Sequence, residues 1–318
     1  MWISPYKYVL SLGYLCSDIN QSILSAVLPF LIATYHYDYT TAAMLVTVSN
    51  VFGAFVQPFI GMLSDKKNKL LYMTLGVLLA SGGMAVTGFI SNFFGLCIVV
   101  IISGIGVVMF HPQAAKLVNS VSSKNAKGKG MSIFSFGGKV GFTLGPVYTA
   151  FLMNLFGMKG TILFLIPGIV FGIVCSFFNK DFENLDVLEV EKKEKVKSEQ
   201  KDDWSGFIKL CCVVFSRSIL SNGISTFLAF YFIQQFSKSN SFASMLLSVF
   251  YGIGSITLLG GGIADCFGHR KMVRLSFCIF LPAIFIFTNT SHFVIALIML
   301  IFMTCGESLS YSPMVVLG

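Results

Sequence analysis

Long apolar runs separated by short polar breaks extend along almost the whole chain. There are ten such runs, and most approach or exceed the roughly 20 residues that an α-helix needs to cross a bilayer. They cover approximately residues 7–34, 40–63, 70–90, 93–115, 130–156, 160–178, 205–236, 242–264, 272–289 and 292–316. The pattern predicts an all-α membrane protein with ten spanning helices.

The composition supports a membrane protein and argues against an enzyme. Of the 318 residues, 55% are apolar and only 11% are charged, less than half of the roughly one quarter that covers a soluble domain. The eight cysteines lie mostly in apolar runs without C-x-x-C spacing, so neither a disulfide framework nor a metal site is expected. The chain also contains no phosphate-binding loop, nucleophile elbow or metal-ligand cluster in its sequence.

The positions of the basic residues predict how the helices face. If the N-terminus is cytoplasmic, 18 of the 22 Lys and Arg residues fall in cytoplasmic segments, and only Lys159 and Lys238 fall outside. Basic residues are retained on the cytoplasmic side, so the N-terminus and the central loop are expected there. The net charge of +8 is thereby explained by the loops, and no nucleic-acid partner is expected.

One long polar segment divides the chain. Residues 179–203 carry nine acidic and six basic side chains and cannot bury enough apolar surface to fold alone. We expect a cytoplasmic linker between a six-helix bundle at 1–178 and a partial bundle of about four helices at 204–318. This segment could serve as a solvated tether or have a regulatory role, and the sequence leaves both interpretations open.

A short loop pattern occurs twice, 200 residues apart. Gly61 and Asp65 are followed by Lys66, and Gly261 and Asp265 are followed by Arg270. The glycine allows close backbone approach, the aspartate can cap the next helix, and the basic residues suit lipid headgroups. Internal repeats are typical of transporters, in which one half rocks against the other.

These residues resemble a known family. The stretch from Gly61 to Lys69 resembles the loop signature of the major facilitator superfamily, although Asn68 and Cys266 stand where that family usually has glycine and a basic residue. The resemblance implies the major facilitator fold, with two helical bundles and twelve helices around a central cavity.

A glycine ridge in the fifth run extends the resemblance. Gly141, Gly145 and Pro146 resemble the core of the family's antiporter motif, with Thr149 and Ala150 in place of its final glycine pair. Gly137, Gly141 and Gly145 share one helix face and suit close helix contact. Packing alone and a direct transport role both remain open for this ridge.

Several further stretches resemble the fosmidomycin-resistance branch of the family: residues 17–22 with Leu28 and Pro29, Gln57 with Pro58, residues 110–112, and residues 136–138 with Gly145 and Pro146. This resemblance implies a bacterial-type cytoplasmic membrane and export of a phosphonate antibiotic. It implies a proton gradient rather than a cofactor, and a small-molecule substrate bound within the lipid bilayer. The sequence does not determine the oligomeric state, and a monomer is expected.

Four charged side chains lie near the middle of predicted spans: Asp18, Lys139, Arg217 and Glu307. Each shares a helix face with other polar residues, among them Gln21 beside Asp18, Asn222 beside Arg217 and Tyr311 beside Glu307. Charges inside a membrane are costly and usually mark a pathway. The polar faces are expected to line one wet cavity.

The roles of these residues follow from their chemistry. A buried carboxyl group can take up and release a proton near neutral pH, so Asp18 and Glu307 are candidates for proton coupling. Arg217 and Lys139 could hold an anionic substrate, with Gln21, Asn222 and Tyr311 as further substrate contacts. A fixed ion pair between an acidic and a basic member is the structural alternative.

His111, near the expected end of the fourth span, could titrate near neutral pH and take part in proton coupling. Alternatively, it could cap carbonyls freed by Pro112.

Three functions remain open at this point. The sequence favours a proton-coupled exporter, an importer of an organic solute is the first alternative, and a transport-inactive remnant or sensor is the second. The last arises because the second half offers four spans where the repeat predicts six, so the chain is expected to be incomplete at its C-terminal side.

Overall fold

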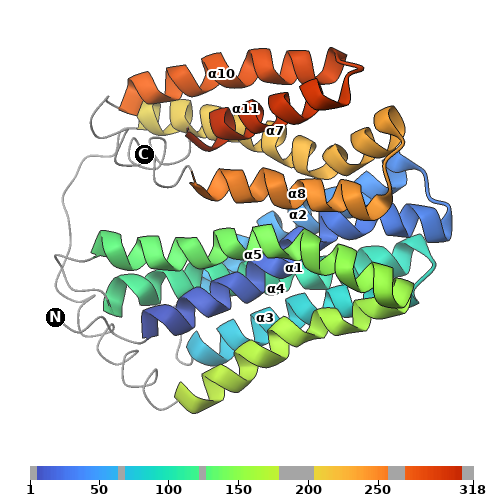
Figure 1. Ribbon diagram of the computed structural model, residues 1–318. Helices are drawn as coiled ribbons and strands as arrows, with labels where there is room; N and C mark the ends of the chain where they lie inside the picture. The colour runs from blue at the N-terminus through green and yellow to red at the C-terminus, as the bar shows by residue number, and fades with distance from the viewer. Residues whose placement is uncertain (1–5, 64–68, 122–126, 179–203, 257–268, 310–318) are drawn as a thin grey trace. The chain divides into compact units, whose positions relative to one another are not determined.

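All secondary structure in the described residues is helical (Figure 1). The computed structural model describes residues 6–63, 69–121, 127–178, 204–256 and 269–309. The chain forms two compact units, Met1–Lys197 and Ser198–Gly318, which are described separately below.

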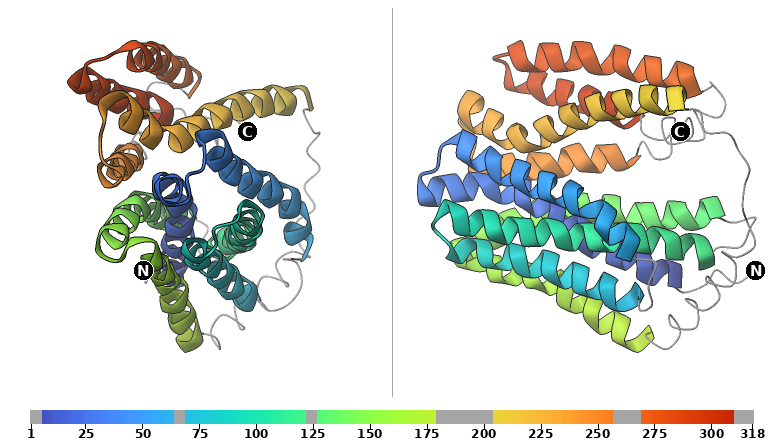
Figure 2. Two further views of the ribbon diagram at one scale, coloured as in Figure 1. Left: turned by 90° about the vertical axis from the view of Figure 1, so that its right-hand side faces the viewer. Right: turned by 180° about the vertical axis from the view of Figure 1, so that it is seen from behind.

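The first unit is built around its N-terminal helix. Viewed end-on in the left panel of Figure 2, α1 lies between α5 and α4, and it is the most buried of the candidate membrane spans. Its apolar core joins α1, α3, α4, α5 and residues 166–178, with Leu10, Phe110 and Phe171 fully buried. The elements are α1 (Tyr6–Tyr35), α2 (Tyr39–Leu63), α3 (Lys69–Val86), η1 (Thr87–Phe89), α4 (Phe93–Val121), α5 (Lys127–Phe156), η3 (Gly157–Leu165) and a helix over residues 166–178.

The second unit contains four described helices, α7 (Trp204–Phe236), α8 (Asn240–Ile256), α10 (His269–Asn289) and α11 (Phe293–Leu309). Helices α10 and α11 pack side by side, and α8 packs against both α7 and α11. The Tyr231 hydroxyl on α7 donates a hydrogen bond to the Phe287 carbonyl on α10 over 2.6 Å. Helix α7 is therefore linked to α8 by packing and to α10 by a hydrogen bond.

The outer surfaces of both units suit lipid. Phe94, Phe177 and Phe285 are 80%, 80% and 70% exposed, and aromatic surface of this kind is costly in water. Six helical segments of the described chain are long and apolar enough to cross a bilayer, namely Tyr6–Tyr35, Tyr39–Ile60, Leu70–Phe89, Phe93–Val118, Ile133–Phe178 and Lys271–Asn289. The predicted all-α membrane class is confirmed, with a described helix in each of the ten apolar runs.

Two helix boundaries differ from the sequence prediction. Helix α4 continues through Pro112 to Val121 instead of ending near residue 115, because membrane helices tolerate proline where neighbouring groups satisfy the freed carbonyls. The run predicted as a helix from residue 160 is a 3-10 helix until Leu165, and the α-helix begins just before Pro167. Proline is favoured in the first turn of an α-helix, where its missing N–H costs nothing.

Asp38 caps the start of α2. Its Oδ1 atom accepts a hydrogen bond from the Thr41 backbone N–H over 3.2 Å, and hydrogen bonding by Thr41 holds the pKa of this exposed carboxyl below its usual range.

Replacing Asp38 with alanine is therefore expected to lower the melting temperature of the purified protein slightly, whereas Asp38→Asn retains the cap and leaves it nearly unchanged. The pKa of Asp38 is lower in the folded state than in the unfolded state. The charge of Asp38 therefore adds to the free energy of unfolding above the unfolded-state pKa, and this contribution is lost as the pH falls through the folded-state pKa. The difference in melting temperature between wild type and Asp38→Ala should accordingly shrink in acid, to the part that a neutral cap retains. A difference that stays the same down to low pH would contradict a contribution from the charge of Asp38.

Candidate functional site

The first candidate site brings together an acid and an imidazole from two helices of the first unit. Asp18 on α1 is buried, with its side chain 3% exposed, and its Oδ1 atom lies 3.3 Å from Nε2 of His111 on α4. Because α4 continues past Pro112, His111 lies within the helix and faces Asp18. The expected position of His111 near the end of the helix is therefore wrong.

Glycines of α5 make room for this carboxylate. A side chain at Gly138 would place its Cβ atom 2.6 Å from Oδ2 of Asp18 and 2.8 Å from the Tyr14 ring, both closer than atoms can pack. Gly141 meets the backbone of α1 at Leu15, one turn away from Asp18. The carboxylate is therefore pressed against a face of α5 that is bare of side chains.

The glycine ridge extends along the α1–α5 contact opposite residues 11–22 of α1. A Cβ atom at Gly137 would collide with the Ser11 carbonyl, and one at Gly145 would collide with the Ser22 hydroxyl. The neighbouring Pro146 is also buried. Gly137, Gly141 and Gly145 thus all lie at the interface with α1, where they make room for polar side chains that include Asp18 and Ser22.

An aromatic wall holds the imidazole in place. The Tyr14 ring meets His111 edge to face with centroids 4.9 Å apart, and it stacks on Phe134 of α5 at 4.4 Å. His111 remains 29% exposed, so the pair is open on its imidazole side. A proton or a polar ligand could reach Asp18 along that side.

Polar atoms around Asp18 are incompletely satisfied. Oδ1 of Asp18, Oδ1 of Asn20 and Oε1 of Gln113 are buried without a hydrogen bond among the described residues. Asn20 donates through Nδ2 to the Cys16 carbonyl and to the Ser81 hydroxyl, each over 2.8 Å. A buried acceptor without a partner is costly, and taking up a proton at the carboxylate relieves that cost.

The other predicted site residues of the first unit, Lys139 and Gln21, differ in how far they are directed towards Asp18. Lys139 is partly buried on α5 and interacts electrostatically with Asp18. Gln21 is exposed, although it follows Asp18 by three residues on α1, whereas Ser22 and Ser25 are buried. The polar face predicted on α1 is therefore only partly directed into the unit.

Tyr14, Asn20 and Gln113 were not among the predicted site residues. Tyr14 and Gln113 had no sequence signal beyond their proximity along the helix to Asp18 or His111, whereas Asn20 also lies in the stretch 17–22 that carries the family resemblance.

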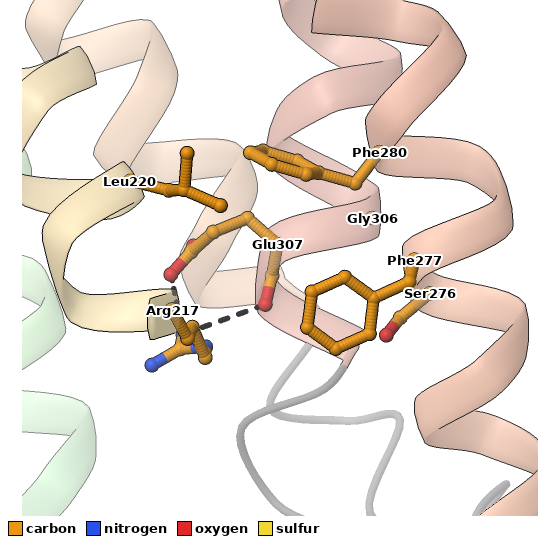
Figure 3. Close-up of a pocket in the computed structure, with 7 residues that line it drawn as sticks. All are labelled: Arg217, Leu220, Ser276, Phe277, Phe280, Gly306 and Glu307. Carbon is orange, nitrogen blue, oxygen red and sulfur yellow. Dashed lines mark hydrogen bonds and ion pairs between the residues drawn. The ribbon is translucent and has the colours of Figure 1, made fainter. Parts of the chain in front are cut away.

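The second candidate site lies in the second unit (Figure 3). Nη2 of Arg217 on α7 donates a short hydrogen bond to Oε1 of Glu307 on α11 and a longer one, over 3.4 Å, to the Glu307 carbonyl oxygen. Both side chains are largely buried, at 16% and 12% exposure. Of the four charged residues predicted within the spans, these two form an ion pair. A fixed ion pair was the alternative to a role of Glu307 in proton coupling and of Arg217 in substrate binding.

The surroundings of this pair are mostly apolar. Figure 3 shows Leu220 of α7 and Phe277 and Phe280 of α10 around it, and Ser276 and Gly306 complete the wall. The cavity among these side chains has a volume of about 10 Å³, close to the minimum for one water molecule. As bounded by the described residues, this cavity is therefore too small for a solute beside Arg217.

The remaining predicted residues lie away from both pairs or outside the described chain. Asn222 is exposed and donates to the Ser218 carbonyl of its own helix over 2.9 Å. Gly61 falls in the last turn of α2, and Arg270 in the first turn of α10. Asp65, Lys66, Gly261, Asp265 and Tyr311 lie outside the described residues.

A larger hollow in the first unit is unlike a substrate site. It has a volume of about 520 Å³ and lies among α1, α5 and residues 166–178. Its walls are apolar apart from Tyr148, whose hydroxyl donates to the Leu163 carbonyl over 2.6 Å. Ligand sites usually contain several convergent polar groups, so the two charge pairs are the stronger candidates.

Comparison with known proteins gives a consistent result. The family model described as Major Facilitator Superfamily matches residues 10–318. The fosmidomycin resistance protein of Escherichia coli (strain K12) is 23% identical over 276 residues, which cover 83% of this chain and 66% of that protein. The chain thus spans about two thirds of the length of this relative.

Solved structures share the fold. A bacterial homolog of the human lysosomal transporter Spinster, in an inward-facing and occupied conformation, superimposes with a TM-score of 0.78 at 16% identity, covering 98% of this chain and 74% of that one. A D-xylose–proton symporter superimposes with a TM-score of 0.75 at 15% identity, covering 98% of this chain and 81% of that one. At these identities the similarity establishes the fold alone.

Proposed function

Because the chain belongs to the major facilitator superfamily, we propose that it is a secondary transporter that exports a small drug-like or anionic molecule in exchange for protons. Membership in this family makes the chain a multi-pass membrane protein with a small-molecule substrate, and a transporter rather than an enzyme. Export as the direction is supported by the relative named for resistance to fosmidomycin.

The observation that carries the proposal is the buried pair of Asp18 and His111. A carboxylate in the membrane interior is costly unless it is paired or protonated, and such residues usually lie on proton pathways. Here its neighbour is an imidazole, a side chain that can both accept and donate a proton through its ring nitrogens. The pair therefore offers a place where a proton can be loaded and released within the first unit.

Orientation and assembly complete the proposal. The strong bias of Lys and Arg toward alternate loops supports a cytoplasmic N-terminus and a cytoplasmic segment at 179–203. In this orientation His111 lies nearer the cytoplasmic end of α4, where an exchangeable proton would leave or enter. We propose a monomer in the bacterial cytoplasmic membrane, with the proton gradient as its energy source.

Transport by the chain as it stands provides the test. Expressed in drug-sensitive bacteria, it is expected to improve growth across a toxin panel that includes fosmidomycin. Inverted membrane vesicles should accumulate the same compound when a proton gradient is imposed, and a protonophore should abolish the uptake. A chain that inserts well but moves none of these compounds would contradict the proposal, and movement in the opposite direction would favour an importer.

A further inference from the structure

The large apolar hollow of the first unit lies in a wedge between two helices. It has a volume of about 520 Å³ and is walled by α1, α5 and the helix over residues 166–178. In Figure 1, α5 and that last helix (yellow-green) converge where η3 joins them and diverge towards their other ends. All residues that line the hollow belong to the first unit, so it is a feature of that unit alone.

Separate contacts fix the two walls of the wedge. The glycine ridge holds α5 against one face of α1. On another face of α1, the Phe171 ring occupies the space beside Gly13, and Gly168 lies against the Ser81 side chain of α3. Near η3 the walls meet, because the Tyr148 hydroxyl of α5 donates a hydrogen bond to the backbone of η3 over 2.6 Å. The wedge is therefore held by the packing around it and closed at the end near η3.

Both the floor and the rim of the hollow are apolar. The floor is formed by α1, where Cys16 and Ile19 are only 3% and 8% exposed. The rim includes Leu144 of α5 and Ile166, which are 44% and 45% exposed and belong to the lipid-facing surface of the unit. The polar group among the described lining side chains, the Tyr148 hydroxyl, already bonds to the backbone. A charged or polar ligand would lose its hydrogen bonds here, and apolar cavities stay dry, so the occupant must be apolar.

The size and the depth of the hollow match one hydrocarbon chain. An apolar cavity of about 150 Å³ can bind benzene, so about 520 Å³ suits roughly three times as many carbon atoms, close to a phospholipid acyl chain. At 1.5 Å of rise per residue, Leu15 and Leu144 lie about 14 and 18 Å along their helices from the ends at Tyr6 and Phe156. The hydrocarbon core of a bilayer is about 30 Å thick, so this depth is in its acyl region.

We propose that this hollow is a binding site for one acyl chain of a membrane phospholipid, which inserts between α5 and the helix over residues 166–178. The lipid headgroup stays at the membrane surface, and the acyl chain fills the wedge down to its floor on α1. Leu15 and Ile19, which line that floor, are also the residues whose backbone meets Gly141 of α5. The bound acyl chain therefore packs beside the α1–α5 contact. Its binding does not depend on the direction or the coupling of transport.

Native mass spectrometry of the purified chain tests this site without requiring transport. The probe is phosphatidylglycerol with palmitoyl and oleoyl chains, added to delipidated protein, and one molecule is expected to bind more tightly than those that follow. Ile166→Trp fills the hollow from its rim and should lower the affinity for that first molecule by about tenfold or more, because expelling about two methylene groups already has that effect. Ile169→Trp is the matched control. Ile169 lies on the same helix and is 44% exposed, but it does not line the hollow, so the affinity should be unchanged.

A second variant and further lipids separate recognition of the acyl chain from attraction of the headgroup. Leu144→Trp fills the hollow from the α5 wall and should have the same effect, also in the event that Ile166→Trp fails to fold. Phosphatidylcholine with the same chains should bind equally well, whereas phosphatidylglycerol with two octanoyl chains should bind more weakly. An equal loss of affinity in Ile169→Trp would overturn the inference, and so would tight binding of the first lipid that survives both filling variants.

Competition separates a resident lipid from a transported molecule. A compound that the chain exports should leave the tightly bound lipid in place, because the polar candidate sites lie outside the hollow. Displacement of the lipid by that compound, with export lost in Ile166→Trp, would assign the hollow to the substrate and overturn the lipid proposal. Lipid binding without export of any compound would overturn the proposed function alone.

Discussion

Replacing Gly141 with alanine is expected to destabilise the first unit by about 1–3 kcal/mol, the usual cost of forcing extra atoms into a packed interior. The new Cβ atom would collide with the Leu15 carbonyl of α1, and it would lie 3.1 Å from the Asp18 Cβ atom. Backbone atoms cannot rotate away, so α1 and α5 must move apart. The measurement is the melting temperature of the purified protein, together with the yield of folded protein in the membrane.

Gly82→Ala is the matched control. It makes the same chemical change in a helix of the same unit, but its Cβ atom would meet only the Leu165 side chain, at 3.9 Å. Alanine is favoured over glycine in a helix by about 1 kcal/mol, so this variant should be unchanged or slightly more stable. If Gly141→Ala and Gly82→Ala lowered the melting temperature equally, the α1–α5 contact would not be the cause of the destabilisation.

The sequence predicted the parts of the fold that depend on hydropathy. Each apolar run contains a described helix, because a helix that crosses lipid must be apolar along nearly its whole length. The spacing of Gly137, Gly141 and Gly145 likewise predicted a close helix contact, since small side chains at intervals of four residues share one face. Spacing on one helix cannot identify the helix that fills the opposite side, and only the structure shows that this is α1.

Pairing of the polar residues could not be predicted for a similar reason. Helical periodicity assigns a residue to a face, but the direction of that face depends on how the helix is rotated in its bundle. Gln21 therefore shares a predicted face with Asp18 yet is exposed. Arg217 and Glu307, 90 residues apart, carry no sequence signal that they meet. His111 was predicted near a helix end because the fourth apolar run was taken to end near residue 115, whereas the helix continues to Val121.

Substituting Asp18 with asparagine is expected to abolish proton-driven export while preserving exchange of substrate across the membrane. Asparagine nearly matches the carboxylate in shape, so it should fit against Gly138 and His111, but it cannot take up or release a proton. Coupling between two sites typically changes affinity 5–150-fold, and in wild type the apparent affinity for the exported compound should vary with pH within about that range. In the variant this dependence should disappear, together with accumulation against a gradient.

Asp38→Asn is the matched control for that experiment, because it makes the same carboxylate-to-amide change at the exposed cap of α2, outside the membrane spans. It should accumulate substrate as wild type does. The two activities are measured in the same inverted vesicles, accumulation under an imposed proton gradient and exchange of labelled for unlabelled compound without one. Asp18→Asn vesicles that still accumulate substrate would remove Asp18 from proton coupling. Loss of both activities at equal expression would instead assign Asp18 to substrate binding or to folding, and the melting temperature of the purified variant separates those two.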